Sequence, residues 1–242
     1  MTNLSISHTL QKRPLLWYLL VPLSIQLILV SLYFSNEPVL QSIIVPEVSK
    51  NKYINREFGL LENLQNLILL ISFIFCLKNI QQVTPSYRWA AIIVCLGVLF
   101  FLLEEIDYGW HFRELWFGLP KDVKEGYFRN LHNSNEGLLR RIIQALSDIS
   151  LGILFVISPL IKQKIPRLRR VKIIPSKRFV LSAIGLIFTT ILVETLMFLN
   201  PDMNDPLNNN LGEFMELWFY FIAFLYLIYL RDQYSSQPVE KE

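Results

Sequence analysis

The residues of this chain that could do chemistry are carboxylates and histidines beside long apolar runs. A carboxylate inside a membrane-spanning helix costs about 3 kcal/mol, so each one needs a partner or a function. Glu194 lies within an otherwise apolar run, and most of the others lie at the ends of such runs. The candidates are Glu62, Glu104, Glu105, Asp107, His111, His132, Asp148, Glu194, Glu213 and Glu216, with the amides of Asn66, Asn130 and Asn133 as further polar residues.

Several of these residues have the spacing of a single helix face. Glu104, Asp107 and His111 lie on one stripe if the third apolar run continues outward as a helix. Gly109 weakens that continuation, because glycine inside a helix costs about 1 kcal/mol. Such polar faces turn away from lipid, toward the bundle interior or a water-filled cavity. A second polar helix face, with residues at i, i+3 and i+4, lies at the start of the second run, in Glu62, Gln65 and Asn66.

A metal site is the first explanation for these residues. Carboxylate and imidazole side chains from several helices form the metal centres of helical bundles. The available ligands fit zinc, which takes histidine and carboxylate, or the oxygen-seeking ions Ca²⁺ and Mg²⁺. The predicted ligands are Glu104, Glu105, His111 and His132.

Two explanations without a metal stay open. Clustered carboxylates raise one another's pKa, so that one of them stays protonated and serves as a general acid. The alternative is structural: the acids pair with arginines of the loop after the third run, or lie at helix N-termini, where the helix dipole favours negative charge. If the carboxylates act as general acid and base without a metal, the catalytic residues are Glu104, Asp107, His132 and a buried Glu194.

The elements that must position these residues are membrane helices. The chain of 242 residues has 52% apolar and only 18% charged side chains. Its apolar residues fall into six runs of about membrane-spanning length, and this distribution excludes a soluble enzyme, a disordered chain and a disulfide scaffold. In hydrocarbon every backbone polar group must be bonded within its own segment, so runs of about 20 apolar residues are helices. We expect residues 1–242 to form one all-α polytopic membrane helix bundle of about six transmembrane helices with an interfacial outer loop. The expected spans are 15–33, 60–77, 89–107, 142–161, 179–199 and 214–230.

The sidedness of the chain follows from its lysines and arginines. Eight of them lie in residues 162–178, between the fourth and fifth runs. Basic loops stay in the cytoplasm during membrane insertion. This predicts a multi-pass protein of the cell inner membrane with cytoplasmic N- and C-termini, and it places the acids at the extracytoplasmic end. The basic loop contacts anionic membrane lipids. Nucleic acid is not expected as a partner, because the loop is short and lacks interleaved aromatic residues.

Two motifs of the predicted outer loop resemble those of a family of bacterial multi-pass membrane proteins. Its members pair a Glu-Glu-x-x-aromatic-Gly motif after a span with a later Asn-Leu-His-Asn. The family usually has glutamine after the glycine, where this chain has Trp110. The resemblance implies a shared outward-facing site and no particular activity. It covers residues 104–133 and marks Glu104, Glu105, Gly109, Asn130, His132 and Asn133.

Three functions fit a polar layer of this kind. The first is a membrane enzyme, with or without a divalent metal, acting on a lipid or lipid-linked substrate at the outer leaflet. The second is an accessory subunit that holds a partner protein in a membrane complex. The third is an ion-coupled transporter in which Glu194 and Asp148 titrate, although the cytoplasmic halves of the spans lack ionisable residues. The serine-hydrolase, P-loop and dinucleotide-binding motifs are absent.

Overall fold

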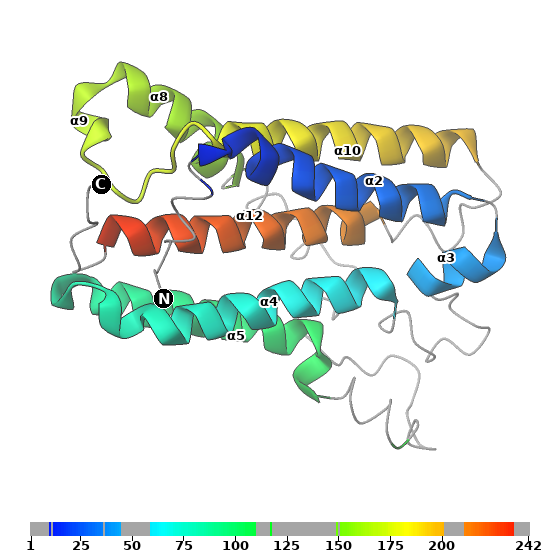
Figure 1. Ribbon diagram of the computed structural model, residues 1–242, viewed down its shortest axis with the longest axis horizontal. Helices are drawn as coiled ribbons and strands as arrows, with labels where there is room; N and C mark the ends of the chain where they lie inside the picture. The colour runs from blue at the N-terminus through cyan, green and yellow to red at the C-terminus, as the bar shows by residue number, and fades with distance from the viewer. Residues whose placement is uncertain are drawn as a thin grey trace.

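The computed structural model describes residues 10, 12–35, 37–44, 59–109, 117, 149, 151–200 and 211–234. The described chain is an all-α bundle, as predicted, whose long helices lie along one axis and alternate in direction (Figure 1). The helices are η1 (Leu16–Leu20), α2 (Val21–Tyr33), α3 (Pro38–Ile44), α4 (Leu60–Asn79), η3 (Ile80–Gln82), η4 (Pro85–Tyr87), α5 (Arg88–Glu105), η5 (Asp107–Gly109), η6 (Ile153–Ile157), α8 (Ser158–Lys164), α9 (Pro166–Arg169), α10 (Phe179–Leu199) and α12 (Leu211–Tyr234).

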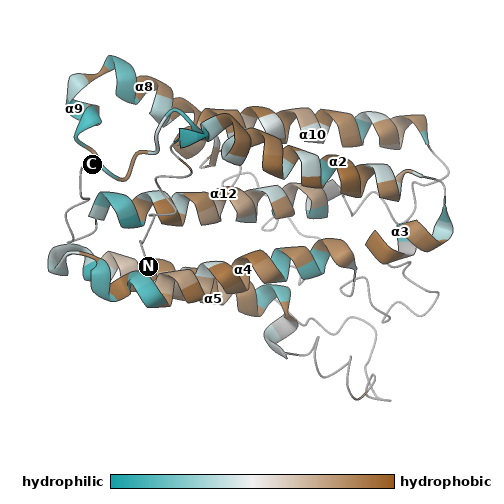
Figure 2. Cartoon of the chain, in the orientation of Figure 1, coloured by the Kyte–Doolittle hydropathy of each residue, from teal (hydrophilic) through white to brown (hydrophobic). Residues whose placement is uncertain are grey.

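Five helical segments in the described part of the chain are long and apolar enough to cross a membrane. Apolar residues cover most of their length, and hydrophilic residues gather on α8 and α9 (Figure 2). The predicted fourth span, 142–161, is described mainly from residue 151, where the helical chain runs through η6 and α8. The five segments are Leu16–Tyr33, Leu60–Gln82, Pro85–Glu105, Phe179–Leu199 and Gly212–Tyr234.

The outward faces of these helices are apolar. On α5, Trp89, Ile93 and Leu96 are all more than half exposed, and α10 exposes Ile187 and Ile191 in the same way. A soluble protein rarely exposes continuous apolar stripes of this extent, whereas lipid solvates them well. The described fold is therefore that of a membrane protein.

The central helix of the bundle is α12. It packs against α4 on one side and against α10 and α2 on the other, while α5 packs against α4 (Figure 1). The contact with α10 is close because Gly185 has no side chain. A Cβ atom built at Gly185 would lie 2.4 Å from Cζ2 of Trp218, a residue of α12 that is only 1% exposed. Small residues at helix contacts allow this kind of approach in membranes.

Two single π-helical turns interrupt the bundle, each just before a proline. Pro22 follows η1, and Pro159 follows η6. Proline has no N–H to donate to the preceding turn, so a carbonyl there loses its usual partner. Ser182 of α10 donates a hydrogen bond of 2.6 Å to the carbonyl oxygen of Tyr18. A hydroxyl from a neighbouring helix thus replaces the bond that the proline removes, as burial in lipid requires.

The basic segment 162–178 folds back onto the last turns of α12. Nζ of Lys162 and Oη of Tyr229 both donate hydrogen bonds to the carbonyl oxygen of Ile174, at 2.7 and 2.8 Å. Nζ of Lys172 donates another, of 2.8 Å, to the carbonyl oxygen of Gln233. We call this end of the molecule the basic end and the opposite one, where α4 and α12 begin and α5 ends, the polar end.

Candidate functional site

Five carboxylates from three helices gather at the polar end, and we call them the acidic layer. Four of the five are buried, and Glu216 is partly buried. The helices bring them together because α4 begins at this end, beside the start of α12 and the end of α5 (Figure 1). The acidic layer consists of Glu62 on α4, Glu104 and Glu105 on α5, and Glu213 and Glu216 on α12.

Tyr220 links two helices of the acidic layer. Its hydroxyl donates a hydrogen bond to Oε1 of Glu105, across the bundle from α12 to α5. Glu216 and Glu213 lie one and two turns before Tyr220 on the same face of α12, so this face brings the phenol and two further carboxylates together. A carboxylate paired with a partly buried hydroxyl can exchange a proton with a bound molecule.

Tyr220 was not predicted from the sequence, because it lies within an apolar run that contains several aromatic residues. The spacing of residues in this run could have identified Tyr220. Glu213, Glu216 and Tyr220 are spaced by three and four residues, which places all three on one face of a helix.

The end of α5 holds Glu104 and Tyr108 together. The hydroxyl of Tyr108 donates a hydrogen bond to Oε1 of Glu104, one helical turn earlier. Tyr108 lies beyond the span, and this bond raises its pKa because the carboxylate stabilises the protonated phenol. The backbone of Tyr108 is left-handed, with φ of 53°, an uncommon conformation for a large side chain that often marks a functional site.

The predicted continuation of the third helix to Asp107 is wrong. The helix ends at Glu105, and the chain turns through η5, where Gly109 has φ of 94° and its N–H donates to the carbonyl oxygen of Ile106. This φ is available to glycine at little cost. Glu104 and Asp107 therefore do not form one stripe of a continuous helix with His111.

The defined residues of the sequence Glu-Glu-x-x-aromatic-Gly all take part in contacts or backbone geometry at this turn. The first Glu accepts a bond from the aromatic residue of the motif, Tyr108, and the second accepts one from Tyr220 of another helix. The glycine supplies the left-handed end of the turn. Each defined position of the motif thus has a structural role at the acidic layer.

Two buried glutamines hold the first turn of α12. Nε2 of Gln65, on α4, donates to the carbonyl oxygen of Glu213 at 2.8 Å and lies 3.3 Å from its Oε2. Nε2 of Gln26, on α2, donates to the carbonyl oxygen of Phe214 at 2.7 Å. The spacing of polar residues indicated Gln65 but not Gln26, because an isolated polar residue in an apolar run has no spacing pattern to identify it.

Three buried amide oxygens near this turn lack a hydrogen-bond partner in the structure: Oε1 of Gln65, Oε1 of Gln26 and Oδ1 of Asn66. A buried acceptor without a partner costs about 1–3 kcal/mol.

Glu194 does not join the acidic layer. The buried residues of α10 recur every four positions, at Gly185, Thr189, Val193 and Met197. Glu194 follows Val193 and is turned about 100° away, so its side chain is exposed among Ile191 and other apolar residues. The prediction of a buried acid at this position is therefore wrong.

The remaining predicted residues are not tested by the structure. The side chain of Asp107 and the residues His111, Asn130, His132, Asn133 and Asp148 lie outside the described residues. Within the described residues, no group of three or more His, Cys, Asp or Glu side chains has an arrangement that could hold a metal ion. Only Glu104 and Glu105 of the predicted metal set are described, so the metal site stays a prediction.

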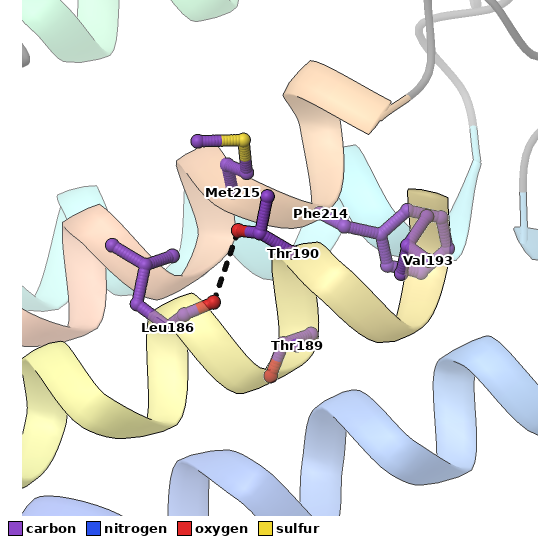
Figure 3. Close-up of a pocket in the computed structure, with 6 residues that line it drawn as sticks. All are labelled: Leu186, Thr189, Thr190, Val193, Phe214 and Met215. Carbon is purple, nitrogen blue, oxygen red and sulfur yellow. Dashed lines mark hydrogen bonds between the residues drawn. The ribbon is translucent and has the colours of Figure 1, made fainter. Parts of the chain in front are cut away.

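A shallow apolar groove lies between α10 and α12 (Figure 3). Its two threonine hydroxyls bond to their own helix, Thr189 to the carbonyl oxygen of Gly185 and Thr190 to that of Leu186. The groove therefore offers contact to apolar groups and adds no polar group to the acidic layer. Its lining residues are Leu186, Thr189, Thr190, Val193, Phe214 and Met215.

No protein-family model, curated protein or solved structure matches this chain. The geometry of the acidic layer is therefore the basis for a function.

Proposed function

We propose that this protein is an integral membrane enzyme acting on a lipid or lipid-linked substrate at the outer leaflet. It lies in the cell inner membrane with both termini in the cytoplasm, so that the acidic layer faces the extracytoplasmic side. The observation that carries the proposal is the hydrogen-bonded pair of the buried Glu105 and the partly buried Tyr220, held by separate helices within a layer of carboxylates. A positioned phenol and carboxylate are the parts of a general acid–base system.

The two glutamates of the motif have different roles in this proposal. Neighbouring residues of a helix point about 100° apart, and here Glu104 bonds to Tyr108 while Glu105 bonds to Tyr220. Glu105, which bonds to Tyr220 of α12, is the proton-transfer residue. Glu104, which bonds to Tyr108 in the turn after α5, is the carboxylate ligand for a divalent metal, with His111 and His132 of the predicted outer loop as the imidazole ligands.

The donor set fits a catalytic metal of the zinc type, since zinc sites combine histidine with one carboxylate and keep a position open for water or substrate. Such an ion would supply Lewis-acid activation of a phosphate or carbonyl group. The protein's own side chains orient the substrate and exchange its protons. A lipid can approach sideways, because α5 faces outward along most of its length.

The test is the metal content of the full chain, purified in detergent without chelator. We expect about one equivalent of divalent metal in the wild type, and less than about a tenth of an equivalent in Glu104→Gln and in His132→Ala. Losing a residue that only hydrogen-bonds to a metal ligand already lowers metal affinity by about 10-fold or more, and the proposed ligands bind the metal directly. Glu194→Gln is the matched control, because it removes an exposed carboxylate from a different helix. A wild type without metal, or metal retained in both ligand variants, would refute the metal-dependent form of the proposal.

A second candidate function, an accessory subunit, is favoured by Glu194 alone. A carboxylate on an apolar outward face is costly in lipid and is stabilised by a donor from a partner helix. Under this function the protein co-purifies with one membrane partner in a fixed ratio, and Glu194→Leu abolishes the association. Retention of the partner by that variant would contradict it.

A further inference from the structure

Phe155 fixes the position of η6 between α10 and α12. The centroid of its ring lies 5.4 Å from that of Phe179 on α10 and 5.3 Å from that of Tyr226 on α12. After η6 the chain continues through α8 to the basic end, where Nζ of Lys162 donates to the carbonyl oxygen of Ile174. The direction of η6 and α8 is therefore from the polar end toward the basic end, parallel to α12 and antiparallel to α10.

The shallow apolar groove of Figure 3 continues this contact toward the polar end. On α10, Thr190 follows Phe179 by 11 residues. On α12, Met215 precedes Tyr226 by 11 residues. Eleven residues make about three helical turns, so each groove residue projects from the same side of its helix as the aromatic residue does, about 16 Å nearer the polar end. Thr190 and Met215 both line the groove, which therefore lies on the same side of α10 and α12 as Phe155.

The residues of this chain that would reach the groove are those before η6. Eleven residues before Phe155 is Gln144. If the chain continues as a helix, Gln144 comes level with both Thr190 and Met215. Residues 140–148 and 150 lie outside the described residues, and Ile149 is helical. Two counts, one along α10 and one along α12, thus lead to the same place for one segment.

The exposure of Ile149 indicates which side of such a helix faces the groove. Ile149 is 59% exposed and belongs on the lipid side. Gln144 and Arg140 precede it by five and nine residues, which is about 140° and 180° around a helix, so both face the bundle. Arg141 is only about 80° from Ile149 on the same helix.

Gln144 and Arg140 each come level with a matching group of α10. The hydroxyl of Thr190 donates to the carbonyl oxygen of Leu186, and its oxygen can still accept a hydrogen bond from the amide of Gln144. Glu194 follows Thr190 by four residues, one turn nearer the polar end. Arg140 precedes Gln144 by four residues, so in an antiparallel helix it comes level with Glu194. A carboxylate on an apolar outward face is costly in lipid, and a cation at its level removes much of that cost.

We propose that residues 140–150 of this chain dock as a helix in the groove between α10 and α12, with Gln144 beside Thr190 and Arg140 paired with Glu194. The occupant of the groove is then the first half of the fourth span, and Glu194 has its partner within the chain. This docking does not rest on the proposed enzyme activity. It competes with the accessory-subunit function, in which a partner helix supplies the donor to Glu194.

The first experiment is cysteine crosslinking of the full chain in isolated membranes, in a background with both native cysteines replaced by alanine. Single cysteines at each position from 142 to 148 are combined with Thr190→Cys or with Met215→Cys and oxidised with copper phenanthroline. A disulfide forms only when the two Cα atoms come within about 7 Å. We expect crosslinks within one chain in both series, with the highest yield at Gln144→Cys and at positions three or four residues from it.

Phe188→Cys is the matched control for Thr190→Cys. Phe188 is 51% exposed and lies two residues before Thr190, about 160° around α10, so its crosslink yield should be at least several-fold lower. Peptide mass spectrometry identifies the joined residues. Crosslinks within one chain to both α10 and α12 support the docking. A crosslinked dimer, an adduct with another protein, or no crosslink in either series overturns it, because a second copy, a partner or lipid would then occupy the groove.

The second experiment tests the ion pair by thermal unfolding of the full chain in detergent. Arg140→Gln and Glu194→Gln should each lower Tm, and the double variant should lower it little further, because the second change removes a group that has already lost its partner. Arg141→Gln is the matched control, and its effect should add to that of Glu194→Gln.

Charge reversal keeps this second test decisive if a neutral variant folds poorly. Arg140→Glu combined with Glu194→Arg should recover most of the Tm that either reversal loses alone. Additive effects of the Arg140 and Glu194 changes, or no recovery on reversal, overturn the pairing. Neither readout depends on a bound metal, so failure of this docking and failure of the proposed function are distinguishable.

Discussion

At the scale of single residues, Tyr220 and Glu105 form the contact on which the proposed chemistry depends. The phenol comes from α12 and the carboxylate from α5, two helices whose described packing runs mainly through α4. A hydrogen bond to a charged group contributes more than one between neutral groups, because the low dielectric of the interior strengthens it. The pair therefore both aligns the helices and positions a proton.

We predict that Tyr220→Phe lowers the free energy of unfolding by about 1–3 kcal/mol, because it leaves a buried carboxylate oxygen without its phenol donor. Denaturation of the purified protein in mixed micelles measures the change. Tyr87→Phe, at an exposed tyrosine of the basic end, is the control and should have little effect. Adding Glu105→Gln to Tyr220→Phe should cost less than the sum of the two single changes, and simple additivity would show that the two groups do not interact.

A second residue-scale prediction concerns the turn after α5. Gly109 has φ of 94° and open space around its Cα, so Gly109→Ala adds only backbone strain. We expect it to destabilise the protein by about 1 kcal/mol or more, since an L-residue resists the left-handed conformation. Gly97→Ala is the matched control, also in open space but inside α5, and should stabilise the protein by about 0.5–1 kcal/mol. Equal effects of the two changes would contradict the turn.

At the scale of helices, the sequence predicted long elements well and their irregular features poorly. The span 179–199 coincides with α10, because apolar length is the physical requirement of the membrane and is visible in composition. The π-turn before Pro22 was not predicted, since it depends on Ser182 of another helix. The orientation of Glu194 was also missed, because the buried face of a helix that is apolar all round is decided by its neighbours.

The contact between α10 and α12 gives a prediction at the same scale. Gly185→Ala would place a methyl group against the ring of Trp218, and overpacking of this kind costs about 1–3 kcal/mol. Unfolding monitored by tryptophan fluorescence measures it. Gly152→Ala, a helical glycine with nothing within 4 Å, should be neutral or stabilising. Combining Gly185→Ala with Trp218→Leu should recover part of the loss, and no recovery would contradict the contact.

At the scale of the whole molecule, charge and hydropathy divide the bundle into two unlike ends. The basic segment 162–178 folds onto α12 at one end, while buried acids of three helices lie at the other. Because membrane insertion keeps basic loops in the cytoplasm, the proposed topology has the acidic layer on the opposite side. Sequence alone could predict this separation of ends. It could not predict which acids meet, because that depends on the packing of α12 between α4 and α10.

The sidedness predicts how each end reacts with a membrane-impermeant maleimide. In a background with both native cysteines replaced by alanine, Ser35→Cys at the polar end should be labelled in intact spheroplasts. Val171→Cys, exposed in the basic segment, should be labelled only after permeabilisation. The reason is that translocating a loop with eight basic residues opposes the positive-inside rule. The reverse labelling pattern would place the acidic layer in the cytoplasm, and a substrate of the outer leaflet could then not reach Glu104.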